Sequence, residues 1–347
     1  MTPIDLLGTL FEATDQTERN GWIQWVWDQQ LPQGGFRGSP FTGPWKECGG
    51  TDDDGQPITL TPTLSSNQAH LASTYTALLV LSILRAPLDK LNRPGLVAFL
   101  RSCQFEDGSF SPLRKEMNAE RDVRMVLCAC VISDLVADWT GVNVEQSERF
   151  VQACCSYDGG FGQRPQQESQ GGTTYCALAS LHLLSSVSPT ISAPSLSTQP
   201  TISWLLHRQI QPRDVPFQAD FDEEDQSGPK TRSISGGFQG RPGKLGDCCY
   251  SFWCGGGLSI LGAQSLIDGP ANKAFLLRCQ SIVGGFGKAP LERPDPFHTY
   301  SALAALSLFA SIDDKELGKM DALRNMSKSA LGWLESERTR LGWLNSI

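Results

Sequence analysis

The chain has 347 residues, of which 40% are hydrophobic and 19% are charged, and its 29 basic and 37 acidic side chains give a net charge of −8. A chain of this length can bury roughly three quarters of its unfolded surface, as one large domain or two ordinary ones. The acidic balance argues against nucleic acid as the main partner. The ordinary apolar content excludes a wholly disordered chain.

The termini and cysteines indicate the compartment. The first residues lack a basic segment followed by an apolar one, so no secretory signal is visible. The longest apolar stretch, around Ala77 to Leu84, is far shorter than the roughly 20 residues that span a bilayer, so we expect no membrane span. Two cysteine pairs are sequence neighbours, which is poor disulfide geometry: Cys154/Cys155 and Cys248/Cys249. We therefore expect free thiols or metal ligands, and a cytoplasmic protein.

A repeat sets the predicted architecture. A short apolar segment runs five times into a glycine-rich turn with phenylalanine. The anchoring phenylalanines are separated by 74, 51, 77 and 48 residues, which indicates a unit of about fifty residues with insertions in two intervals. They are Phe36, Phe110, Phe161, Phe238 and Phe286.

Each turn is followed by an apolar run of helical length that is rich in small residues. Each unit is therefore predicted to be a helix, a glycine turn, a loop and a second helix. Such hairpins must cover one another's apolar faces, and the small residues indicate close packing in an inner ring. We predict an all-α fold, an α/α toroid or barrel that forms one domain over residues 1–347. The second helices are expected at Ala69–Leu84, Val123–Val136, Thr173–Leu184, Cys249–Leu261 and Thr299–Phe309.

Three insertions, near residues 42–66, 185–200 and 212–235, are predicted to be surface loops. The second is rich in Ser, Thr and Pro, and the third carries a run of acidic residues. The acidic run could dock a basic partner, but a solvated charged loop is the simpler interpretation.

The densest group of chemically active residues surrounds Cys249 and His298. Cys249 lies 11 residues after Phe238, and His298 lies 12 after Phe286, so both begin an inner helix in successive repeats and should meet at one end. Asp247 enters the same helix, and three such ligands with an open position are typical of catalytic zinc. A helix cap, a core cysteine and a surface histidine would explain each residue alone, but not the matched register. Cys248 is an alternative ligand.

A cationic group lies beside this predicted metal site. Arg241, Lys244 and Tyr250 suit a phosphate or diphosphate, although surface salt bridges are an alternative. Aromatic residues of the inner helices could line a tunnel for an apolar chain, and core packing is the alternative for each. These are Tyr75, Tyr175, Phe252, Trp253 and Tyr300.

The repeats and motifs resemble the β subunit of the protein prenyltransferases, from about Gly21 to about Ala310. Gly236–Lys244, Asp247–Trp253 and Phe297–Tyr300 carry the resemblance. It implies an α/α barrel that pairs with a helical-repeat α subunit. It also implies transfer of a farnesyl or geranylgeranyl group from its diphosphate to a cysteine near the carboxyl end of proteins such as small GTPases.

The resemblance also implies the roles of individual residues. One zinc ion is expected on the Asp-Cys-His group, a diphosphate and isoprenoid beside it, and a peptide carboxylate further along. The implied residues are Asp247, Cys249 and His298 for zinc; Gln170, Gly171, Gly172, Arg241, Lys244, Tyr250 and Trp253 for the diphosphate and isoprenoid; His70, Glu120 and Arg124 for the peptide; and Lys288 with Tyr250 for catalysis.

Some positions depart from the family pattern. Gln170 stands where the family has His, which removes a possible positive charge but keeps an amide donor, and Leu127 replaces a usual aromatic residue. Family members carry a further helical segment upstream of the position of Gly21. It includes a residue whose side-chain size helps to determine the length of the prenyl group that is bound. We therefore expect the amino-terminal part of the family fold to be missing.

The class of prenyltransferase is indicated by Lys288. The Gly284–Lys288 turn resembles the type I geranylgeranyl enzyme, in which a Lys supplies the charge that magnesium gives the farnesyl enzyme. We expect geranylgeranyl diphosphate as donor, no magnesium requirement, and a C-a-a-X signal often ending in Leu. The Asp295–His298 stretch is nearer the Rab type, so farnesyl and Rab-type β subunits are alternatives. A non-catalytic zinc-stabilised scaffold and a terpene cyclase remain rivals, although the aspartate cluster of a cyclase is not visible.

Overall fold

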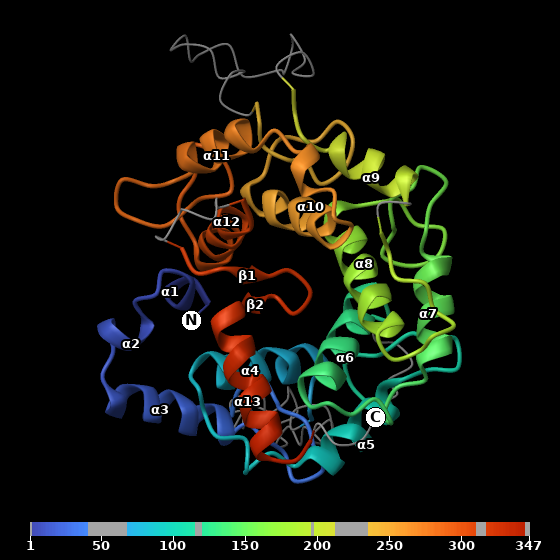
Figure 1. The fold of residues 1–347 in the computed structure, drawn as a ribbon, viewed down its shortest axis with the longest axis vertical. Coiled ribbons are helices and arrows are strands. Elements are labelled where there is room, and N and C mark those ends of the chain that lie inside the picture. Colours follow the sequence, from blue (N-terminus) through green and yellow to red (C-terminus); the bar gives the residue numbers. More distant parts are fainter. Residues whose placement is uncertain are drawn as a thin grey trace, which may run out of the picture.

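A computed structural model describes residues 2–40, 68–114, 120–195, 198–211, 235–309 and 317–343. These residues form two concentric layers of helices around a common centre, as predicted (Figure 1). The expected insertions near 42–66 and 212–235 lie outside the described residues, apart from Ser235. The insertion near 185–200 connects the eighth and ninth helices.

The inner layer consists of the small-residue helices that the repeats predict. Neighbours in the chain's repeat order pack against one another: α6 lies between α4 and α8, and α10 lies between α8 and α12 (Figure 1). Their bounds are α4 Leu71–Ile83, α6 Val123–Leu135, α8 Gly171–Ser185, α10 Cys248–Ile260 and α12 Pro296–Phe309. Each agrees with its predicted run to within three residues at either end, which is the usual uncertainty of helix ends.

The outer layer consists of the helices that precede the glycine turns. These helices bury one side only, as α7 does with Phe150 and Val151, and leave the other side to solvent. Their bounds are α3 Gln16–Trp27, α5 Arg93–Cys103, α7 Val144–Ala153, α9 Gln199–Leu206 and α11 Gly269–Arg278.

Each repeated turn is closed by an antiparallel bridge to its phenylalanine, and the pairs are Gln30–Phe36, Gln104–Phe110, Cys155–Phe161, Gln209–Phe238 and Gln280–Phe286. A glycine with φ near +90° begins each turn, and at Gly34 a Cβ would lie 2.0 Å from the Gly95 carbonyl oxygen, so a side chain cannot fit. The Phe36 N–H donates to the Thr74 hydroxyl on the next inner helix at 2.9 Å. The turns therefore fix the starts of the inner helices at one end of the ring.

The remaining elements close the ring. Helix α1 packs on α12 and α4, while α13 packs on α4 (Figure 1). A short hairpin precedes α13 and was not predicted from the sequence. These elements are α1 Thr2–Leu6, α2 Leu10–Ala13, β1 Met320–Asp321, β2 Met326–Ser327 and α13 Lys328–Arg340. The 3-10 helix η4 Gln264–Leu266 lies elsewhere, between α10 and α11 in the chain.

Three tyrosines of the inner layer hold this hairpin. The Tyr175 hydroxyl donates to the Ala322 carbonyl oxygen at 2.6 Å, and the Tyr75 hydroxyl donates to the Arg324 carbonyl oxygen at 3.3 Å. Tyr300 donates to the side chain of the hairpin residue Asn325. Each of these hydroxyls, on residues predicted to line an apolar tunnel, thus has a polar partner in the hairpin, as buried hydroxyls require.

The described residues also bear on the predicted free thiols. Every cysteine among the described residues is a free thiol, and all of them except Cys155 are buried. Within the described ranges, no helix combines the length and hydropathy that crossing a bilayer needs.

Candidate metal and diphosphate site

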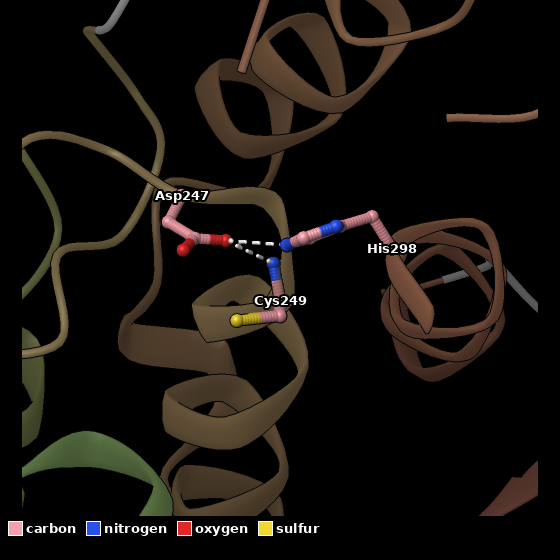
Figure 2. A group of neighbouring side chains, drawn as sticks. All are labelled: Asp247, Cys249 and His298. Atoms are coloured by element: carbon pink, nitrogen blue, oxygen red, sulfur yellow. Dashed lines mark hydrogen bonds and ion pairs between the residues drawn. The ribbon is translucent and has the colours of Figure 1, made fainter. Parts of the chain in front are cut away.

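The structure brings Asp247, Cys249 and His298 together (Figure 2). Asp247 caps α10, and its Oδ1 accepts the Cys249 N–H at 3.0 Å. His298 comes from the first turn of α12, and its Nε2 lies 3.4 Å from that same Oδ1. One ligand atom from each residue lies within 4.8 Å of the others. The adjacent α10 and α12 thus produce the grouping that the matched register predicted.

The chemistry of this donor set fits a zinc ion. Cys249 is only 6% exposed, and burial, followed by the negative charge of Asp247, raises the pKa of its thiol. A divalent cation here would favour the thiolate and offset the charge of the Asp247 carboxylate. A thiolate, an imidazole and a carboxylate are the ligand types of zinc, and three protein ligands leave one position open.

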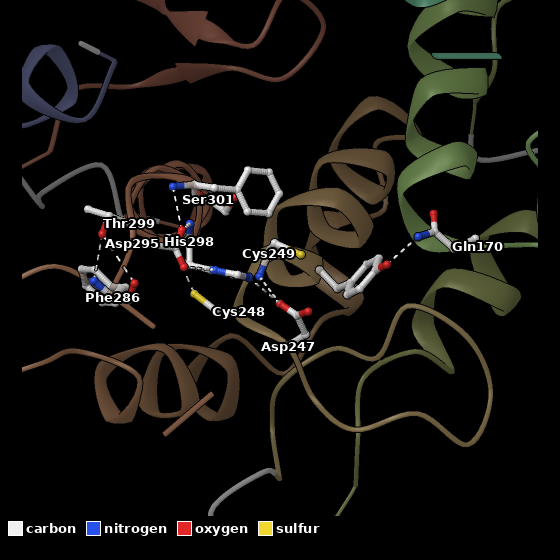
Figure 3. Close-up of polar contacts among 11 residues, drawn as sticks. Gln170, Asp247, Cys248, Cys249, Phe286, Asp295, His298, Thr299 and Ser301 are labelled. Carbon is white, nitrogen blue, oxygen red and sulfur yellow. Dashed lines mark hydrogen bonds and ion pairs between the residues drawn. The ribbon is translucent and has the colours of Figure 1, made fainter. Parts of the chain in front are cut away.

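Asp295 orients the histidine and was not predicted. Its Oδ2 lies 2.5 Å from His298 Nδ1, while its Oδ1 accepts the backbone N–H groups of Phe297 and His298 at 2.9 Å each (Figure 3). This turns Nε2 toward Asp247, and a carboxylate behind a metal-binding histidine typically fixes its ring and tautomer. An aspartate three residues before the histidine at a helix start was the signal in the sequence.

The alternative ligand Cys248 faces away from the group. Its Sγ lies 3.7 Å from the His298 carbonyl oxygen, and the residue is fully buried (Figure 3). Among the described residues, the metal-ligand group contains Cys249 and not Cys248. The sulfur that lies beside Asp247 and His298 is therefore that of Cys249.

A pocket of about 830 Å³ opens beside Cys249. It collects many of the predicted diphosphate and peptide residues, together with polar residues of one loop that were not predicted. Its lining residues are Arg124, Gln163, Gln167, Glu168, Gln170, Gly172, Thr173, Cys176, Arg241, Cys249, Tyr250, Trp253 and Phe297.

Gln170 links two inner helices at this pocket. Its Oε1 caps α8 by accepting the N–H groups of Gly172 and Thr173 at 2.8 and 3.1 Å. Its Nε2 donates to the Tyr250 hydroxyl on α10 at 2.5 Å (Figure 3). The Gln170 amide therefore holds the Tyr250 ring in place. Gly171 permits this close approach, because a Cβ there would lie 2.8 Å from Cys254 Sγ.

Arg241 lies at the mouth of the pocket in an ion pair. Its Nη1 is 2.6 Å from an Oε atom of Glu168, which sequence reasoning missed. Both side chains are substantially exposed, 42% for Arg241 and 63% for Glu168, so water screens the pair and its contribution to stability is small. An oxyanion can therefore compete with Glu168 for the guanidinium.

Arg124 occupies another wall and is held by acidic residues. Its Nη2 lies 2.6 Å from Asp122 and 2.9 Å from Glu120. Asp122 is fully buried, and burial would raise its pKa, but hydrogen bonds from Arg124 and Gln163 lower the pKa further than burial raises it. Asp122 thus remains ionised and fixes Arg124.

Other predicted residues lie outside the pocket lining. His70 caps α4 by accepting the Ala72 N–H at 3.2 Å, and Lys244 and Lys288 are exposed. The Lys288 carbonyl oxygen accepts the Cys248 N–H at 2.7 Å, which fixes its backbone beside the start of α10.

Comparison with known proteins identifies the class. The prenyltransferase alpha-alpha toroid domain matches residues 1–326, so the chain belongs to this family. The match confirms the predicted toroid and extends beyond the expected limits of Gly21 and Ala310 at both ends.

Particular relatives agree with the predicted subunit type. The chain is 37% identical over 261 residues to the geranylgeranyl transferase type-1 subunit beta of Arabidopsis thaliana, covering 73% of this chain and 62% of that protein. It is 32% identical over 343 residues to the Dictyostelium discoideum subunit of that name, covering 94% and 87%. A solved Candida albicans protein geranylgeranyltransferase-I complexed with GGPP matches with a TM-score of 0.75 and 26% identity, over 97% of this chain and 89% of that one. The resemblance to protein prenyltransferase β subunits, above all to type I, is thereby confirmed.

Proposed function

We propose that the chain is the catalytic β subunit of a zinc-dependent type I protein geranylgeranyltransferase. The reaction joins the geranylgeranyl group of its diphosphate to the cysteine sulfur of a carboxy-terminal C-a-a-X motif. The observation that carries this proposal is the contact of one pocket with both a metal-ligand residue, Cys249, and the cationic Arg241. The type-1 names of the relatives support the choice of lipid and subunit.

Asp247, Cys249 and His298 would hold the zinc ion. When bound, zinc supplies the positive charge that makes the thiolate the main form of a substrate cysteine at neutral pH. Asp295 keeps the His298 ring turned toward the other two donors. The proposal pairs this chain with an α subunit in a cytosolic heterodimer.

The diphosphate is bound by donors of α10 and the preceding loop. Arg241 leaves Glu168 for the diphosphate oxygens, and the Tyr250 hydroxyl, held by Gln170, donates to them as well. Lys244 and Lys288 add positive charge from outside the pocket lining. The bond between C1 of the geranylgeranyl group and the diphosphate oxygen breaks as the sulfur of the substrate cysteine bonds to C1. These groups stabilise the negative charge that grows on the departing diphosphate. Removal of one such donor typically costs about 3–4 kcal/mol.

The prenyl chain is expected to lie along an aromatic wall. Trp253 faces the pocket and contacts Phe252 and Tyr175, with ring centroids 5.0 and 5.2 Å apart. This wall provides apolar contacts beyond the diphosphate donors. The peptide carboxylate would lie near Arg124, and Thr173 and Cys176 of the same pocket would contact the prenyl chain. His70 and Glu120 are assigned to the peptide by the resemblance alone.

Two substitutions in the co-purified heterodimer separate the role of the metal ligands from that of the diphosphate donors. Cys249→Ala is expected to abolish zinc binding and transfer, while geranylgeranyl diphosphate still binds. Arg241→Ala is expected to keep zinc and weaken binding of the lipid diphosphate. Zinc content, fluorescence titration of the lipid and transfer to a peptide ending in Cys-a-a-Leu give the three readouts. Full transfer by the Cys249→Ala variant would refute the proposed role of the metal site.

A non-catalytic scaffold is the remaining alternative, because Gln170 replaces the histidine expected by resemblance. Such a protein would retain zinc and its α partner but give no lipid-dependent transfer. The transfer assay on the unmodified heterodimer therefore decides between the two.

A further inference from the structure

A second cavity lies outside the proposed active site. It has a volume of about 310 Å³, and three arginines contribute to its lining: Arg121, Arg149 and Arg164. Phe150, which is 7% exposed, and Asp107 also contribute. None of these residues belongs to the metal or diphosphate group described above.

Two of the arginines are held in place. The guanidinium of Arg121 lies 4.2 Å from the centroid of the Phe105 ring and 4.0 Å from Asp107. The other carboxylate oxygen of Asp107 is engaged by Ser109, whose N–H and hydroxyl donate at 3.0 and 2.5 Å. Arg149 donates from Nε to the Glu145 carbonyl oxygen at 3.3 Å. Donors fixed in this way lose little conformational entropy when a ligand binds.

The charge of this cavity is positive, whereas the chain as a whole carries −8. Its lining contains three arginines and one carboxylate, that of Asp107. Across the part of the chain that the structure describes, neither Arg149 nor Arg164 forms an ion pair with protein. Converging guanidinium groups in a concave site are the typical receptor for phosphate oxygens, which they bind through paired N–H donors.

Two segments of the chain contribute residues to both this cavity and the active-site pocket. Arg121 immediately precedes Asp122, which holds Arg124, and Arg164 immediately follows Gln163. Arg124 and Gln163 line the active-site pocket, whereas Arg121 and Arg164 line the second cavity. The two segments are joined by a hydrogen bond of 2.8 Å from Gln163 to Asp122. An anion in the second cavity thus binds the same two segments that position the peptide end of the active site.

We propose that the cavity formed by Arg121, Arg149 and Arg164 is an oxyanion site for inorganic phosphate or diphosphate. The inference is carried by three guanidinium groups that line one cavity of about 310 Å³, two of which are held by contacts with the protein. Diphosphate as the natural ligand rests on the proposed function, because it is the leaving group of that reaction. The oxyanion site itself does not depend on that function.

Equilibrium dialysis of the heterodimer with radiolabelled phosphate, and separately with diphosphate, tests the site at constant ionic strength. The unmodified protein is expected to bind diphosphate at two sites. The double variant Arg149→Ala/Arg164→Ala is expected to weaken one of them by about tenfold or more, because each arginine supplies charged hydrogen bonds. Arg241→Ala is expected to weaken only the other.

Matched variants control for folding and for net charge. Arg101→Ala removes an exposed arginine that donates to the Thr140 carbonyl oxygen on the outer layer, and it is expected to leave both sites unchanged. Arg149→Lys/Arg164→Lys keeps the charge but loses the paired donors, and it is expected to bind with intermediate affinity. Zinc content confirms that each variant is folded.

The outcomes separate the possibilities. Binding of phosphate and diphosphate that is sensitive to Arg149 and Arg164 supports the site, and the tighter of the two identifies the source of the anion. Failure of the unmodified heterodimer to bind either anion, or binding unaffected by the double variant, overturns it. If the site sensitive to Arg149 and Arg164 is present while the unmodified heterodimer gives no prenyl transfer, this inference stands and the proposed function fails.

Discussion

Substitution of Asp295 by Asn is a specific test of the geometry of the proposed metal site. The Asp295 side chain makes two kinds of contact: Oδ1 caps α12 through two N–H groups at 2.9 Å, and Oδ2 lies 2.5 Å from His298 Nδ1. An amide has one oxygen, so it can keep the cap or accept from the ring, but not both. Loss of a carboxylate behind a metal-binding histidine typically weakens metal affinity 10- to 100-fold, which is about 1.4–2.7 kcal/mol.

Competition with a fluorescent zinc chelator measures this change on the heterodimer. Asp268→Asn is the matched control, because Asp268 caps α11 through the Ala271 N–H at 3.0 Å and Asn caps equally well. Zinc affinity is expected to fall in the Asp295 variant and to stay within about twofold in the control. Equal zinc affinity in the Asp295 variant and the unmodified protein would refute the reasoning that this carboxylate orients a metal ligand.

Three further substitutions test individual roles. Lys288→Asp is expected to make transfer depend on magnesium, since the positive charge proposed to assist the diphosphate is replaced by a carboxylate; an unchanged response to added magnesium contradicts the role of Lys288. Tyr250→Phe is expected to lower kcat on the order of a hundredfold, and wild-type turnover would exclude Tyr250 as a donor. Burial would raise the pKa of Asp122, but hydrogen bonds from Arg124 and Gln163 hold it below the usual 3.8. The Asp122 carboxylate therefore stabilises the fold above pH 3.8. This stabilisation is lost as the pH falls through the pKa that Asp122 has in the folded protein. Asp122→Asn is therefore expected to cost about 1–3 kcal/mol near neutral pH in urea unfolding and less near pH 3, and a pH-independent difference would contradict this.

The register of the repeats made the grouping of Asp247, Cys249 and His298 predictable. Cys249 and His298 follow their turn phenylalanines by nearly equal distances, and each turn is fixed to the start of the next inner helix. Equivalent positions on α10 and α12 are therefore neighbours, which the structure shows. The helices were predictable for the same reason, because small apolar residues over a dozen positions are typical of closely packed helices.

Contacts between loops could not be predicted in this way. Glu168 and Arg241 lie 73 positions apart in loops of different repeats, and nothing in their spacing indicates an ion pair. The helix cap that Gln170 provides and its hydrogen bond to Tyr250 were likewise not predicted. The strands of the hairpin at Met320–Ser327 are two residues each, too short to show an alternating pattern.

The most direct test of the central claim is transfer by the heterodimer to a peptide ending in Cys-a-a-Leu, with zinc retained and magnesium absent. Geranylgeranyl diphosphate and farnesyl diphosphate are compared as donors by kcat/KM. The account predicts efficient transfer of the geranylgeranyl group under these conditions. Preference for farnesyl diphosphate, a requirement for magnesium, or no transfer from either donor would contradict it.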